Sequence, residues 1–160
     1  MENNKYVKLH SLLRMAAALL AIAVFISMFV AKQMVHSEFD RVFVDFSNGA
    51  FFAEEPYDHG NFIAFIGYLL VTVGGLAGLA FVFIDELIGK DLTKKLSFVV
   101  GIVILVGAAA IGTFSPVFKA LNDLKSDDFH TGAAPIVFAC LAALAGACNI
   151  AAPILEDKGY

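Results

Sequence analysis

The residues best suited to chemistry in this chain are three histidines and three aspartates. The histidines are His36, His59 and His130, and the aspartates that could join them are Asp58, Asp127 and Asp128. Imidazole and carboxylate groups suit zinc and copper, and paired imidazoles at helix ends can ligate haem. No spacing enforces such a site, because each histidine falls at the outer end of a different predicted span. Histidines in such positions are usually solvated, so we predict no metal and no other cofactor.

Motifs of common enzyme classes are missing from the sequence. It has no phosphate-binding glycine loop, no nucleophile elbow and no HExxH zinc motif. A hydrolase built on Ser47, Asp58 and His59 would rest on one long loop, which offers little rigid support. Cys140 and Cys148 lie about 12 Å apart along one predicted helix, too far to pair. This departs from four-span thiol oxidoreductases, claudins and connexins, and we predict a protein that is not an enzyme.

Four long apolar runs must position these residues. They contain no Asp, Glu, Lys, Arg or His and extend over residues 15–31, 62–84, 96–118 and 133–155. A helix of about 20 residues crosses the hydrocarbon core of a bilayer, so each run is long enough, or nearly so, to span a membrane. The chain is 59% hydrophobic with a mean hydropathy of +0.79, which excludes an ordinary soluble domain. We predict an all-α membrane protein: one four-helix bundle over residues 1–160, with spans at about 12–35, 62–84, 96–118 and 133–155.

The distribution of cations predicts that both termini are cytoplasmic. Lys and Arg resist translocation, and seven of the 11 lie on the side of the termini. Nine carboxylates lie on the other side, where Asp58, Asp127 and Asp128 would form an acidic outer mouth that attracts cations or basic partners. The first apolar run is too long for a cleaved signal peptide. We therefore expect a multi-pass protein of the plasma membrane.

Small residues recur along the spans. In lipid, helices associate through close packing and interhelical hydrogen bonds, which small and amide side chains permit. Asn149 is the only amide within the four runs, and we expect it to join helices. The glycines placed for packing are Gly67, Gly74, Gly75, Gly78, Gly101, Gly107, Gly112 and Gly146. Packing within one bundle is our interpretation, and a seam between copies is the alternative.

The connection over residues 36–61 is the only one long enough for structure of its own. Phe39, Val42, Phe43 and Phe46 recur at i, i+3, i+4 and i+7, which predicts a short amphipathic helix. Three more aromatic residues follow in the same connection: Phe51, Phe52 and Tyr57. These rings could form a lid on the helices, a docking surface for another protein, or a lipid or small-molecule site.

Two function classes remain open from the sequence. The first is a non-catalytic scaffold or accessory subunit that binds other membrane proteins or copies of itself. The second is an oligomeric channel with a cation-attracting mouth. A single four-helix bundle without interior charge is too tightly packed to conduct, so the channel requires several copies. We expect partners in the lipid bilayer and among membrane proteins, and none among nucleic acids.

Overall fold

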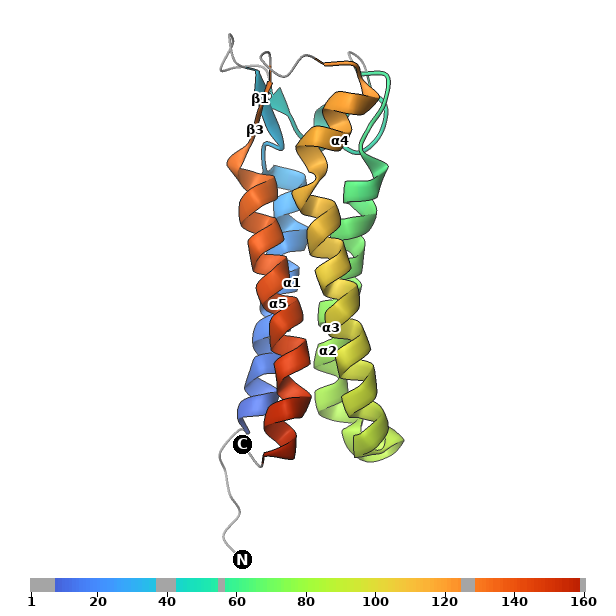
Figure 1. The fold of residues 1–160 in the computed structure, drawn as a ribbon, viewed down its shortest axis with the longest axis vertical. Helices are drawn as coiled ribbons and strands as arrows, with labels where there is room; N and C mark the ends of the chain where they lie inside the picture. Colours follow the sequence, from blue (N-terminus) through green and yellow to red (C-terminus); the bar gives the residue numbers. More distant parts are fainter. Residues whose placement is uncertain (1–7, 37–42, 55–56, 125–128, 159–160) are drawn as a thin grey trace, which may run out of the picture.

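Four long helices lie side by side along the long axis of the molecule (Figure 1). The computed structural model describes residues 8–36, 43–54, 57–124 and 129–158. The long helices are α1 (Leu9–Val30), α2 (Phe62–Ile88), α3 (Lys90–Gly112) and α5 (Ala133–Asp157). Each is long and apolar enough to cross a membrane, which confirms the four predicted apolar helices. Helix α1 packs against α2 and α5, and α3 packs against the same two helices.

The third apolar run, which was predicted as one span over 96–118, forms two helices. Helix α3 ends at Gly112, and after Thr113 a short helix, α4 (Phe114–Leu121), begins. Pro116 explains the interruption, because it has no N–H to donate to the Gly112 carbonyl and its ring would clash with that carbonyl. The predicted end of the first span at about 35 is also wrong, since α1 ends at Val30.

A three-stranded antiparallel sheet lies beyond the helices at one end. Its strands are β1 (Met34–His36), β2 (Phe43–Val44) and β3 (Phe129–Thr131), in the order β2-β1-β3. In the register, Met34 faces Val44 on one side and Thr131 on the other. We call this sheet, the 3-10 turn η1 (Phe46–Asn48), the loop that follows it and α4 the cap, and the opposite end the terminal end, where α1 begins and α5 ends.

The sheet corrects the prediction of an amphipathic helix in the outer segment. Phe43 and Val44 form a strand, and Val44 is fully buried. Pairing with β1 satisfies the backbone of this segment and buries Val44, which outweighs a helical pattern of only eight residues. Phe39 and Val42 lie outside the described residues.

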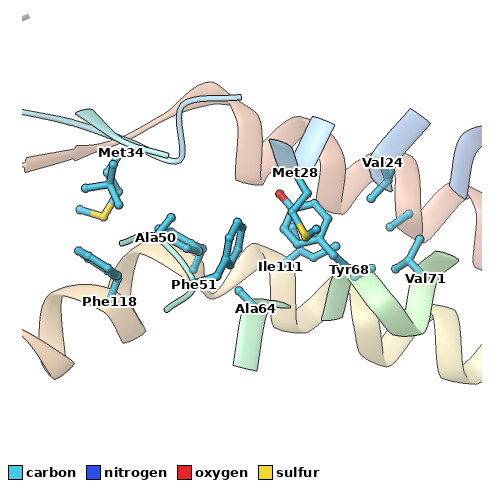
Figure 2. Close-up of a cluster of buried hydrophobic side chains, with 14 of the residues drawn as sticks. Val24, Met28, Met34, Ala50, Phe51, Ala64, Tyr68, Val71, Ile111 and Phe118 are labelled. Atoms are coloured by element: carbon cyan, nitrogen blue, oxygen red, sulfur yellow. The ribbon is translucent and has the colours of Figure 1, made fainter. Parts of the chain in front are cut away.

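Buried apolar side chains run without a break from the cap into the helices. Figure 2 shows Met34 and Phe118 at the cap side, Val24 and Val71 among the long helices, and Phe51 between them. The cap and the helices therefore share one hydrophobic cluster, and the cap surface is held in a fixed position relative to the spans.

Candidate functional site

Side-chain hydrogen bonds attach the cap to the helices. Asn61 is 1% exposed; its Oδ1 accepts a hydrogen bond from Ala64 N at 3.1 Å, which caps α2, and its Nδ2 donates to the Phe114 carbonyl at 3.0 Å. At the end of α4, Asn122 accepts a hydrogen bond from His59 N at 3.0 Å and donates one to the His59 carbonyl at 2.7 Å. The loop before α2 is thus fixed against α4.

Two aromatic residues predicted for docking lie in the core. Phe51 is 1% exposed, and its ring centroid lies 5.6 Å from that of Tyr68 and 5.7 Å from that of Phe114. Tyr57 is 8% exposed and packs edge-on against Phe118. Burial raises the pKa of the Tyr57 phenol above its ordinary value of 10.0, because the phenolate would lose solvation. Both rings stabilise the cap and are covered by it.

A continuous row of phenylalanine rings remains at the surface where the cap meets α1 and α2. Phe52 lies 6.2 Å from Phe62 and 4.9 Å from Phe65, measured between ring centroids. Phe46 joins this group to the end of α1, with its centroid 6.4 Å from that of Phe52 and 4.6 Å from that of Phe29. Phe29, Phe52 and Phe62 are each about half exposed. We call these five residues the aromatic patch.

The acidic and histidine candidates do not assemble into a metal site among the described residues. Asp58, His59 and His130 are exposed on the cap, and the backbone of His36 pairs with Phe129 in the sheet. Over the described ranges, no group of three or more histidines, cysteines or carboxylates could hold a metal ion. The other two members of the predicted acidic mouth, Asp127 and Asp128, fall outside the described residues.

The glycines predicted for packing differ in whether they face the backbone or a side chain of the neighbouring helix. A methyl group on Gly67 would lie 2.8 Å from the Gly107 carbonyl oxygen, and one on Gly107 would lie 2.7 Å from the Gly67 carbonyl oxygen. At this point α2 and α3 meet backbone to backbone. Gly101 and Gly146 make the same kind of contact between α3 and α5. The remaining glycines face side chains: Gly74 faces Ile104, Gly75 faces Ala21, Gly78 faces Asn149 and Gly112 faces Ala139.

Three helices meet at Asn149. Pro153 lies inside α5 and has no N–H, so the Asn149 carbonyl lacks its usual intrahelical donor. Ser97 of α3 supplies a replacement, its Oγ donating to that carbonyl at 2.9 Å, and both residues are fully buried. The Asn149 side chain donates to the Ala145 carbonyl at 3.3 Å, and its Oδ1 occupies the space that a side chain on Gly78 of α2 would need.

Ser97→Ala is expected to destabilise the protein by about 1–3 kcal/mol, because it leaves the buried Asn149 carbonyl without a donor. In a Pro153→Ala background the new N–H of residue 153 can bond that carbonyl, so the same Ser97→Ala change should cost less. Unfolding of the four proteins in one detergent measures the difference. Equal costs of Ser97→Ala in both backgrounds would contradict this role of Pro153.

A buried ion pair that was not predicted from the sequence joins α1 and α5 at the terminal end. Arg14 Nη2 lies 3.5 Å from Glu156 Oε2, and the two side chains are 1% and 11% exposed. The spacing along each helix indicates that both residues are buried. Arg14 precedes the buried Ala17 and Ala21 by three and seven residues, and Glu156 follows the buried Ala152 by four. Both charged residues thus lie on the buried face of their helix. Their pairing had no signal, because they lie near opposite ends of the sequence.

One further buried hydrogen bond connects α2 to the segment before β1. Beyond the contacts above, the Tyr68 hydroxyl of α2 donates to Gln33 Oε1 at 3.3 Å, just before β1, and both residues are fully buried.

Comparisons with protein-family models, with curated proteins and with solved structures found no match. The aromatic patch is apolar, partly exposed and built from α1, α2 and the cap, and it is our candidate functional site.

Proposed function

We propose that this protein is a non-catalytic membrane scaffold or accessory subunit whose aromatic patch binds another membrane protein. The composition of the patch supports this proposal most directly. Membrane-interface belts use Trp and Tyr, whose polar atoms contact water and headgroups. The patch consists of Phe alone, and Phe46 and Phe52 come from the cap, beyond the ends of the long helices. A Phe surface at that level favours a dry contact with a partner.

The proposal places the four long helices across the plasma membrane as a bundle, with both termini cytoplasmic and the cap outside. The positive-inside rule supports this orientation, because most Lys and Arg residues lie on the side of the termini. The aromatic patch then lies at the outer surface of the bilayer, where a partner can contact the cap and the ends of α1 and α2 together.

The interior of the helices supports a non-catalytic role. In the described chain, much of the space between α1, α2, α3 and α5 is filled by small and apolar side chains, among them the fully buried Ala21, Val71, Ile104 and Ala145. The buried Arg14 is paired with Glu156, and the buried Asn149 accepts a hydrogen bond from Ser97. Such an interior leaves no polar passage for a substrate or an ion through one copy. Binding at the surface is the activity that remains for this arrangement.

The charge near the patch suggests the chemistry of the partner. Glu54 lies two residues after Phe52 and is exposed. Carboxylates at the rim of an apolar contact favour Lys or Arg on the facing surface. We therefore propose a partner that presents apolar side chains bordered by basic residues.

Photo-crosslinking in native membranes tests the proposal. A photoreactive phenylalanine analogue at position 52 or 62 should capture one protein partner. Phe83 is the matched control, because it is 77% exposed on α2 but lies near the other end of that helix. The same partner should be lost on purification of a Phe52→Ser, Phe62→Ser double variant and retained with Phe83→Ser. Lipid adducts alone at positions 52 and 62 would overturn the proposal, and capture of further copies in a closed ring would favour the channel.

A further inference from the structure

A groove between α3 and α5 at the terminal end has a polar mouth and apolar walls. Its volume is about 440 Å³, within the roughly 300–1,000 Å³ range of small-molecule sites. Phe98 and Val99 of α3 form one wall, and Pro153 and Ile154 of α5 form the other. These apolar residues lie deeper along the helices than the charged residues at the mouth, which are Lys94, Lys95 and Asp157.

The charges at the mouth favour an anion. Lys94 forms an ion pair with Asp157, so one carboxylate is matched by one amine. Lys95 is exposed, and within the described chain no carboxylate is paired with it. The lining residues themselves therefore carry one positive charge in excess, and the Asp91 and Glu156 carboxylates lie near enough to act on Lys94. Because Lys94 is itself partly exposed, it can also turn toward a ligand.

We infer that this groove binds one phospholipid with an anionic headgroup. The lipid phosphate contacts Lys95 at the mouth, and an acyl chain lies along Phe98 and Ile154. The order of polarity along the groove matches that of a lipid molecule, since the cations lie at the end of the helices and the apolar walls lie toward mid-depth. Pro153 contributes a rigid ring to the α5 wall of the groove. This site is remote from the aromatic patch and does not depend on the partner proposed above.

Fluorescence quenching in nanodiscs tests the inference, because the chain has no tryptophan. A single Trp replaces Phe98 or, on the opposite wall, Ile154. The nanodiscs contain phosphatidylcholine with a minor fraction of brominated phosphatidylglycerol or, separately, brominated phosphatidylcholine. We expect about fivefold preferential association of phosphatidylglycerol at both positions, the effect of one cation near an anionic lipid.

The control reporter is Leu12→Trp on α1. Leu12 is 46% exposed and lies one turn after the exposed Lys8, so it has a nearby cation but does not line the groove. Phosphatidylglycerol preference should be weaker there. In the Phe98→Trp protein, Lys95→Gln should abolish the preference and Asp157→Asn should increase it. Equal preference at positions 12 and 98, or no response to either charge change, would overturn the inference.

Discussion

Replacing Arg14 by methionine is expected to destabilise the folded protein by about 3–5 kcal/mol, the usual cost of breaking a buried ion pair on one side. The Arg14 side chain is 1% exposed, and Glu156 has its Oε2 3.5 Å away with only 11% of its side chain exposed. Without the guanidinium, the Glu156 charge remains in a poorly solvated site between α1 and α5. The free energy of unfolding, measured in one detergent for the parent and the variant, gives the cost.

Two further variants separate the loss of the pair from the loss of a large side chain. Arg14→Met combined with Glu156→Met removes both charges, and buried pairs replaced by apolar residues often leave stability unchanged or raised. Lys94→Met is the matched control, because it breaks the exposed pair with Asp157, the neighbour of Glu156. Exposed pairs contribute little. If Arg14→Met cost no more than Lys94→Met, or if the double variant were as unstable as Arg14→Met, the ion pair would not be the cause.

Arg14 also illustrates what the sequence could and could not predict. As a basic residue ahead of an apolar run, it was counted as a cation on the side of the termini. Its burial followed from a second property, its phase with Ala17 and Ala21, which a search for charge-free runs ignores. The identity of Glu156 as its partner required knowing that α1 and α5 are neighbours, and no pattern within either helix contains that information.

The helices were predictable, and the cap was not, for related reasons. An apolar run of about 20 residues can satisfy its backbone in lipid only as a helix, so four runs fix four helices. The strands have two or three residues each, too few for a periodic signal, and β3 pairs with β1 across most of the chain. Pro116 gave a local signal of a nearby helix end, but the end was predicted at residue 118, and α3 in fact ends at Gly112.

The sequence identified a group of aromatic residues in the outer segment, but it did not show which of them are buried and which are exposed. Phe51 and Phe52 are adjacent and chemically identical, yet Phe51 is 1% exposed and Phe52 is 47% exposed. Which one enters the core depends on the path of the loop, which the Asn61 and Asn122 hydrogen bonds fix from α2 and α4. The exposure of Phe52 in the candidate site therefore depends on contacts between segments that are distant in sequence.

Gly107→Ala is expected to destabilise the protein by about 1–3 kcal/mol or more, although alanine is the better helix former. A methyl group at this position would lie 2.7 Å from the Gly67 carbonyl oxygen and 2.9 Å from Val71 Cγ2. The closer obstacle is backbone and cannot rotate away, so α2 and α3 must separate. Gly107→Leu should be worse still, and unfolding in one detergent measures both variants.

Gly112→Ala is the matched control on the same helix. Its methyl group would meet only Ala139 Cβ, at an ordinary contact distance of 3.5 Å, so the helix propensity of alanine should leave the protein as stable as the parent or more so. The two variants distinguish a glycine that a close helix contact requires from one that can be replaced. Gly107 and Gly112 were both predicted to pack helices, but of the two only Gly107 lies against the backbone of a neighbouring helix. Equal effects of the two changes would show that α2 and α3 do not approach at Gly67 and Gly107, and the close packing of the helices would have to be sought elsewhere.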